Sequence, residues 1–180
     1  MKRILVVVDM QTDFVDGALG TLEAVAILGN VAAKIKAYAA DPEGVILVTY
    51  DTHTENYMNT SEGKYLPVPH CIKGTDGWEL HPAVADALVG VMYTAVEKPT
   101  FGSVELPGLV KKVADGDDFS VELIGLCTDI CVVSNTLLLK ATYPEVSISV
   151  DAVCCAGVTP ATHAAALTTM NMCQINILNL

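Results

Sequence analysis

The hydrophobic positions of the chain fall into two alternating patterns. Short aliphatic runs, each followed by polar or turn residues, predict buried β-strands at 3–8, 45–50, 91–96, 119–125, 146–150 and 174–178. Longer segments with apolar residues at helical spacing predict helices at 23–40, 82–89, 105–114, 129–141 and 160–172. By contrast, residues 51–78 are polar and rich in Pro, Gly, Asn and His, and a loop of that length in a compact domain commonly carries function.

Strands that alternate with helices predict right-handed crossovers and therefore parallel strand pairing. The expected fold class is α/β: a three-layer, Rossmann-like arrangement in which a mostly parallel six-stranded sheet has helices on both faces. No internal repeat, low-complexity tract or Ser/Gly-rich linker divides the chain, so we expect one domain over 1–180. Ligands of such sheets bind outside the carboxyl ends of the strands, which is where a site is expected.

Reactive residue types gather at the predicted strand ends. They follow the first five strands in this order: Asp9; Asp51 and His53; Lys98; Cys127, Asp129 and Cys131; Asp151, Cys154 and Cys155. Only 17% of all residues are charged, so this many ionisable groups at one edge are hard to explain as surface solvation. The pattern therefore indicates a site for chemistry at this edge of the sheet.

Composition narrows the classes of partner. The chain has 180 residues, a formal net charge of −11 and 52% hydrophobic residues, which excludes a disordered chain. An acidic protein of this kind lacks the basic face that nucleic acids and anionic membranes require. Because so apolar a domain has trouble covering its outside with polar groups, we expect a homo-oligomer, a dimer or larger. Six strands buried on both faces account for part of the apolar content.

The start of the chain and its cysteines indicate the compartment. The apolar run after Arg3 stops at Asp9, too short for a signal peptide. No run approaches the roughly 18 apolar residues of a membrane span. The six cysteines are then expected to be reduced thiols of a cytoplasmic protein, and at least one of them is a candidate nucleophile.

Cys131 is the candidate nucleophile. It lies in a strand-to-helix turn with Thr128 as the expected N-cap, where free N–H groups and the helix dipole would lower the thiol pKa and could hold an oxyanion. Asp9, at the end of an aliphatic run, could take a proton from the thiol, and Lys98 could hold the thiolate and orient Asp9. Taken singly, the three residues also fit simpler roles: a small buried side chain, a turn residue and a surface lysine.

Asp51 and His53 form a metal-type pair, and His70 lies further along the same loop. Two imidazoles and a carboxylate suit a divalent ion and leave positions open for water or substrate. Zinc is the expected ion, with iron or manganese as alternatives. Glu62 lies between the two histidines and could add an oxygen ligand.

Five motifs, in order along the chain, resemble those of one family. They are Val-Asp9-Met-Gln-Thr-Asp13-Phe14, Asp51-Thr-His53, Pro-His70-Cys-Ile-Lys-Gly-Thr75, Glu97-Lys98 and Gly-Leu-Cys-Thr-Asp-Ile-Cys131. With these motifs the chain resembles, over nearly its whole length, the isochorismatase-like cysteine hydrolases. Within that family it is most similar to the nicotinamidases, because metal ligands in this loop mark nicotinamidases rather than isochorismatases.

The resemblance implies catalytic roles for individual residues. It implies a triad of Asp9, Lys98 and Cys131. It also implies a non-proline cis peptide just before Cys127, whose backbone N–H would form an oxyanion hole with that of Cys131. Phe14 matches an aromatic wall of the nicotinamide pocket.

The resemblance also implies a role for the metal-type loop. Asp51, His53 and His70 would hold the ion, and Glu62 matches a carboxylate ligand seen in some members. The pyridine nitrogen of nicotinamide would then bind the open metal position and place the carboxamide over the nucleophile. The implied activity is hydrolysis of nicotinamide to nicotinate and ammonia through a cysteine thioester.

Some positions depart from the family pattern and leave the substrate open. Shortly before the second histidine of the loop the family often carries an aromatic residue, and the nearest residues here are Tyr65 and Leu66. After the lysine the family runs through Tyr-Ser-Ala-Phe, whereas this chain has Pro-Thr-Phe101-Gly-Ser. Leu66 and Phe101 are therefore further candidates for substrate contact, and the sequence leaves open whether Trp78 lines the pocket.

Two other functions fit the same residues. One is a related amidohydrolase that acts on a carbamoyl or ureido compound, for which an anchor between metal and ring nitrogen has no use. The other is a thiol redox or metal-binding module without turnover, in which Cys127 and Cys131 would form a reversible disulfide.

Overall fold

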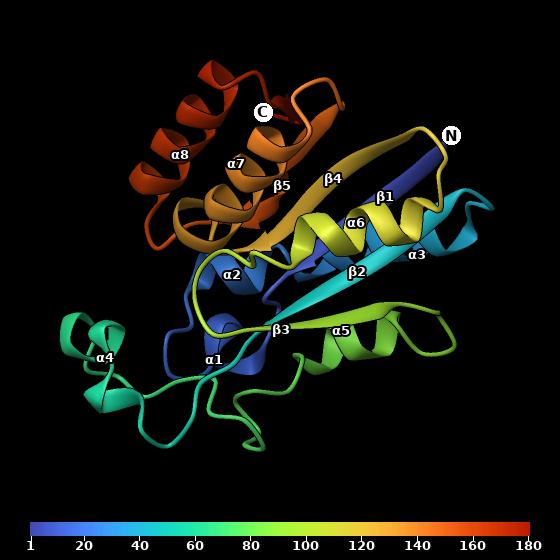
Figure 1. The fold of residues 1–180 in the computed structure, drawn as a ribbon. Helices are drawn as coiled ribbons and strands as arrows, with labels where there is room; N and C mark the ends of the chain where they lie inside the picture. Colours follow the sequence, from blue (N-terminus) through green and yellow to red (C-terminus); the bar gives the residue numbers. More distant parts are fainter.

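The computed structural model describes residues 1–180, and at its centre lies one sheet of parallel strands (Figure 1). The strand order is β3-β2-β1-β4-β5-β6, and every neighbouring pair is parallel. This confirms the expected six-stranded α/β sheet. The strands are β1 (Lys2–Val8), β2 (Gly44–Asp51), β3 (Thr94–Lys98), β4 (Phe119–Leu126), β5 (Ile148–Ala156) and β6 (Asn176–Leu178).

Helices cover both faces of the sheet. Figure 1 shows α6 crossing in front of the sheet and α3 behind it. The helices on the α3 side are α1 (Thr12–Val15), α2 (Leu22–Ala26), α3 (Leu28–Ala40) and α5 (Pro82–Ala87), and those on the α6 side are α6 (Leu106–Ala114), α7 (Val133–Thr142) and α8 (Pro160–Met172). The segment between β2 and α5 holds the short η1 (Tyr57–Asn59) and α4 (Ser61–Tyr65). No helix combines the length and the apolar character that crossing a membrane requires.

The core has two layers, one on each face of the sheet. Leu5 and Val7 of β1 pack with Ile35 of α3, and the alternate residues Ile4 and Val6 pack into the layer of α6, α7 and α8. All four β1 side chains are fully buried, since a central parallel strand has no face toward solvent. This two-sided burial is the physical reason why the strand appears in the sequence as an unbroken aliphatic run.

The structure corrects two expected helix boundaries. The helix expected over 23–40 is two helices, because the chain turns at Ile27, and the Thr21 side chain caps the first of them. The helix expected from 129 begins with η2, a π-helical turn over Thr128–Val132 whose N-cap residue is Cys127. Thr128 is therefore not the cap, and its hydroxyl instead hydrogen-bonds His163 Nδ1 at 2.8 Å.

Strand β5 is longer than expected, which changes the set of residues at the sheet edge. It continues to Ala156 instead of ending at 150, because its last residues pair with β4 beyond an irregularity in the register. Asp151 consequently lies inside the strand and binds Lys34 of α3 at 2.6 Å. Cys154 and Cys155 pack into the two hydrophobic layers. The prediction that these three residues follow β5 at the carboxyl edge is therefore wrong.

Candidate active site

Asp9 leaves the sheet directly after β1 and is completely buried. Its backbone has a φ of 48°, in the left-handed region that Asp tolerates better than most residues. Its Oδ1 accepts a hydrogen bond of 2.6 Å from the Thr49 hydroxyl on β2. Burial raises the pKa of Asp9, although the neighbouring Lys98 opposes the shift. A carboxyl group with a raised pKa can both take up and return a proton near neutral pH.

Lys98 is the last residue of β3 and connects the other groups of the site. It is 1% exposed, so its ammonium group is almost fully removed from water. Burial alone would lower its pKa, but nearby Asp9 and Cys131 raise it, so the side chain stays charged. Its Nζ lies 2.6 Å from Asp9 Oδ2, 3.2 Å from Asp51 Oδ1, 3.1 Å from the Thr100 carbonyl and 3.5 Å from Cys131 Sγ.

Cys131 lies in η2 at the carboxyl end of β4 and is 4% exposed. Burial and the carboxylate of Asp9 raise the pKa of its thiol well above the ordinary value, and Lys98 only partly offsets them. The expectation that the helix start lowers this pKa is therefore wrong for the resting site. A neutral thiol needs a base, and the nearby carboxyl group of Asp9 can serve as one.

The backbone that leads from β4 to η2 brings a free donor to the site. The peptide bond between Leu126 and Cys127 is cis, as the resemblance implies. At Gly125, where φ is 114°, a Cβ would lie 2.1 Å from the Val8 carbonyl oxygen, so only glycine fits beside the end of β1. The N–H of Cys127 donates no hydrogen bond within the chain. It is thus available for an oxyanion.

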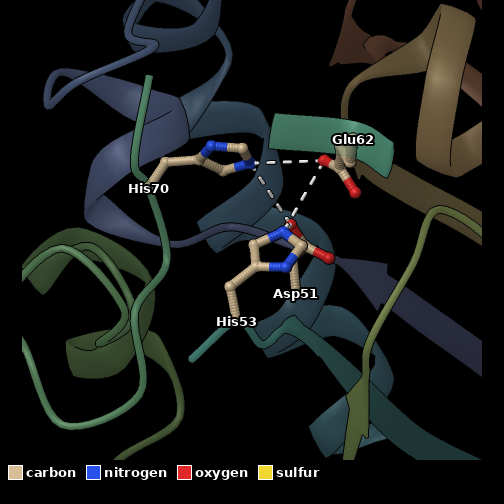
Figure 2. Close-up of side chains that lie close together, drawn as sticks. All are labelled: Asp51, His53, Glu62 and His70. Atoms are coloured by element: carbon tan, nitrogen blue, oxygen red, sulfur yellow. Dashed lines mark ion pairs between the residues drawn. The ribbon is translucent and has the colours of Figure 1, made fainter. Parts of the chain in front are cut away.

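Figure 2 shows a second group of polar side chains, Asp51, His53, Glu62 and His70, which lie close together. Asp51 ends β2, His53 and His70 come from the segment that follows it, and Glu62 reaches in from α4. Their ligand atoms all lie within 4.8 Å of one another. His53 Nε2 is 2.9 Å from Asp51 Oδ2 and 3.6 Å from Glu62 Oε1, and His70 Nε2 is 3.6 and 3.7 Å from the same two oxygens.

These donors fit a divalent metal ion. Although Asp51 Oδ2 is close, the buried His53 Nε2 makes no hydrogen bond. The other ring nitrogen of His70, Nδ1, is 2.9 Å from the Val68 carbonyl, the kind of support that orients metal-binding imidazoles. Two nitrogens and two carboxylate oxygens converging on one point match the ligand preferences of zinc.

The charges within this second group shift one another's pKa values. Burial would raise the pKa of Asp51, but the nearby imidazoles of His53 and His70 and the charge of Lys98 lower it strongly. Burial and the charge of Asp51 raise the pKa of Glu62. The group thus holds one firmly ionised carboxylate, and a bound cation would oppose the rise in the pKa of the second.

Two residues that sequence reasoning did not assign hold this group in place. The buried Gln11 amide accepts from the Asp51 N–H at 2.8 Å and donates to the Asp51 and Trp78 carbonyls at 2.9 and 2.8 Å. Asp13 Oδ2 accepts the N–H of Cys71 at 2.8 Å, directly after His70. Both belong to the first motif, but only their contacts reveal that they position the metal-type loop.

One pocket of about 240 Å³ is lined both by Cys131 and by Asp51, Glu62 and His70 of the second group. The three expected substrate contacts, Phe14, Leu66 and Phe101, all line it. Trp78 does not, because its ring stacks on Tyr50 and the protein interior instead. The other lining residues are Leu19, Thr21, Ala24, Asp51, Glu62, His70, Leu126, Cys127, Ile130, Cys131, Gly157 and Val158.

Asn135 of α7 is a further residue that the sequence did not single out. Its side chain is fully buried and donates to the Cys131 carbonyl at 2.8 Å and to the Phe101 carbonyl at 3.1 Å. Its Oδ1 accepts from the Ser103 N–H at 2.9 Å. It therefore ties the pocket wall after β3 to the turn that carries the thiol.

The parallel sheet and the polar groups at its carboxyl edge define the class of protein. A buried Asp–Lys–Cys cluster next to a His/Asp/Glu group marks this edge as the candidate active site of a hydrolase. The chain belongs to the isochorismatase family, since residues 3–179 match the isochorismatase domain.

Individual relatives agree with this assignment. The chain is 29% identical to the nicotinamidase/pyrazinamidase of Mycobacterium tuberculosis over an alignment of 140 residues. This alignment covers 72% of this chain and 74% of that protein. The crystal structure of a nicotinamidase/pyrazinamidase from Bacillus subtilis superimposes with a TM-score of 0.85 at 23% identity, over 99% of this chain and 100% of that one. The Pyrococcus horikoshii pyrazinamidase in complex with zinc gives 0.76 at 23% identity, over 100% of both chains.

Proposed function

We propose that this chain is a nicotinamidase-type amidohydrolase that converts nicotinamide to nicotinate and ammonia through a thioester on Cys131. The observation that carries the proposal is the position of Lys98 Nζ, 2.6 Å from Asp9 Oδ2 and 3.5 Å from Cys131 Sγ. A base, a nucleophile and the cation between them thus meet in one buried cluster, and the thiol opens into the pocket that the metal-type group also lines. The Mycobacterium tuberculosis relative supports this choice of substrate.

In the first half of the reaction, Asp9 takes the proton of the Cys131 thiol, and Lys98 stabilises the carboxylate before this transfer and the thiolate after it. The sulfur attacks the carboxamide carbon, and the backbone N–H groups of Cys127 and Cys131 hold the oxyanion of the tetrahedral intermediate. The carbon–nitrogen bond then breaks as Asp9 gives its proton to the leaving nitrogen. Ammonia departs, and the acyl group remains as a thioester on the sulfur.

In the second half, water replaces ammonia next to Asp9. Asp9 takes a proton from this water, whose oxygen attacks the thioester carbon. The carbon–sulfur bond breaks, the proton returns to the Cys131 sulfur, and the acid leaves and loses its remaining proton to water to give nicotinate. The carboxyl group of Asp9 thus serves as base and acid in both halves, which suits its raised pKa.

The same proposal assigns a metal to the second group. Asp51, His53 and His70, together with Glu62, would hold one divalent ion, and zinc suits this set of nitrogen and oxygen donors. When bound, such an ion supplies a Lewis acid for a heteroaromatic nitrogen. The zinc complex of the Pyrococcus horikoshii pyrazinamidase supports the choice of metal. Iron and manganese are the alternatives.

Ammonia release tests the proposed function. Purified protein of measured metal content is incubated with nicotinamide, and ammonia is followed in a coupled assay. We expect turnover by the native chain, none by Cys131→Ala, and normal turnover by Cys173→Ala, whose cysteine is exposed and outside the pocket. Full activity of Cys131→Ala would refute the thioester. Absence of turnover together with a reversible disulfide between Cys127 and Cys131 would support the redox alternative instead.

A further inference from the structure

The π-helical turn η2 determines where the proposed oxyanion donors lie. Cys127 directly precedes this turn and Cys131 lies within it, so the conformation of the turn sets the positions of both backbone N–H groups. A misplacement of about 1 Å at a catalytic group can cost about 100-fold in rate. Because π-helical turns are rare, contacts from outside η2 are expected to hold this one in place.

Thr128, the first residue of η2, makes one such contact. Its side chain is fully buried, and its hydroxyl hydrogen-bonds Nδ1 of His163 on α8 at 2.8 Å. This is the only hydrogen bond of that hydroxyl within the chain. His163 is not among the residues that line the pocket, so it contacts the turn without reaching the position of a substrate.

The hydroxyl is the donor in this bond. Burial lowers the pKa of His163, and the nearby carboxylate of Asp129 opposes the shift only in part, so the imidazole is neutral at pH 7. If Nδ1 carried the ring proton, the buried hydroxyl of Thr128 would have no acceptor for its own proton. The tautomer with the proton on Nε2 satisfies both groups, and its Nδ1 fixes the Thr128 side chain as an acceptor.

The start of α8 gives His163 a fixed base. The Thr159 hydroxyl accepts from the Thr162 N–H and the Thr162 hydroxyl accepts from the Thr159 N–H, both at 3.1 Å, so the two residues cap the helix reciprocally. A Cβ at Gly157 would lie 2.9 Å from the Cβ of His163, so the loop before the helix fits closely against this residue.

A second contact joins η2 to the same loop. The carboxylate oxygens of Asp129 accept the backbone N–H of Val158 at 3.1 and 3.2 Å. Because this contact uses the backbone of Val158, it does not depend on the side chain there. Two neighbouring residues of η2 are thus bound to residues 158–163, one near the surface and one, Thr128, in the interior.

On the basis of the proposed function, we propose that His163 is a positioning residue for the oxyanion hole. It acts through Thr128, whose hydroxyl it holds, and so keeps η2 in the conformation that directs the N–H groups of Cys127 and Cys131 at the same oxygen atom. Without this acceptor, Thr128 would have to turn its hydroxyl toward another group, and the donors on either side of it would move.

Steady-state kinetics of nicotinamide hydrolysis by the metal-analysed protein test this role. We expect His163→Ala to lower kcat and kcat/KM together by about tenfold or more, because oxyanion donors act on the transition state. Thr128→Val, which removes the hydroxyl but keeps the shape, should give a similar loss. The double variant should be little worse than either single one, whereas losses that multiply would overturn the coupling between the two residues.

Two further variants separate positioning from general support of the fold. His163→Asn places an amide oxygen where Nδ1 was, so it should restore kcat to within about threefold of the native value. Thr162→Ala removes one half of the reciprocal cap of α8 but does not reach Thr128, so it should lower stability in urea denaturation and leave kcat unchanged. An Asn variant no better than His163→Ala, or a loss of kcat in Thr162→Ala equal to that of His163→Ala, would overturn the proposal.

The same measurements distinguish this role from the function beneath it. If the native chain hydrolyses nicotinamide and His163→Ala does so with native kcat, only the role of His163 is refuted. If the native chain hydrolyses no amide, the proposed function is refuted and the role of His163 with it.

Discussion

Replacing Lys98 by methionine should destabilise the chain strongly and most of all at neutral pH. The side chain is 1% exposed and its Nζ contacts Asp9 and Asp51, two buried carboxylates, at 2.6 and 3.2 Å. Methionine keeps an unbranched aliphatic chain, so the loss is mainly electrostatic. Removing one member of a buried ion pair costs about 3–5 kcal/mol. That is a large share of the roughly 5–15 kcal/mol that stabilises a typical domain.

The loss of unfolding free energy in Lys98→Met should depend on pH, because Asp9 changes its protonation state. Burial raises the pKa of this carboxyl group, and in Lys98→Met the hydrogen bond from Thr49 still opposes the shift but the charge of Lys98 no longer does, so the pKa of Asp9 rises further and the variant favours the protonated carboxyl group. Its pKa in the folded state then exceeds that in the unfolded state, and folding takes up a proton. The deficit of Lys98→Met should therefore shrink by about 1.4 kcal/mol for each unit by which pH falls, down to the pH at which Asp9 of the native chain, whose pKa burial also raises, is protonated as well.

Urea denaturation followed by circular dichroism measures these free energies of unfolding. The double variant Lys98→Met/Asp9→Asn removes the uncompensated charge, and we expect it to be about 2 kcal/mol more stable than Lys98→Met at pH 7. Lys112→Met, at an exposed position of α6, should change stability by less than about 0.5 kcal/mol. A single variant as stable as the native chain, or a double variant no more stable than the single, would refute the electrostatic account.

Three further changes have expected outcomes. His53→Ala should reduce bound zinc, measured by atomic emission after dialysis, to about one-tenth or less; unchanged metal content would contradict the site. Lys34→Met should cost about 3 kcal/mol at pH 7 in urea denaturation. Since Lys34 outweighs burial and lowers the pKa of Asp151, its contribution is present above the unfolded-state pKa and lost as pH falls, so an equal cost at pH 7 and about pH 3 would contradict the pairing. Asn135→Ala should cost about 2–3 kcal/mol, because it leaves buried backbone groups near Cys131 without partners; a denaturation curve like that of the native chain would count against this.

The sequence contained enough information for the sheet and for the position of the candidate site. A central parallel strand is buried on both faces, so its aliphatic run ends where burial ends, and Asp9 marks that point for β1. Cys131 follows from the same rule at the central strand β4, whereas Lys98 ends the edge strand β3, which is only partly buried. Because parallel strands end at one edge, strand ends far apart in sequence could be placed together before any contact was known.

Other features depend on contacts that no local pattern encodes. The end of β5 depends on its register against β4 beyond an irregularity, and that register removed Asp151 from the expected edge. Gln11 and Asn135 act through side-chain bonds to backbone groups more than 30 residues away. The thiol pKa of Cys131 depends on total burial, which outweighs the local helix start.

The candidate catalytic residues and the apolar pocket wall lie on different segments of the chain, and this affects how the activity can change. The spacing of Asp9, Lys98 and Cys131 is set by the ends of β1, β3 and β4 in one sheet, and the close approach at Gly125 fixes β4 against β1. The wall formed by Leu19, Thr21, Ala24 and Val158 lies on separate connecting segments. Substrate range and bond-breaking chemistry are therefore mutable independently. A library confined to these four wall positions should yield many folded, active variants with altered substrate preference, whereas Gly125 should accept almost no replacement.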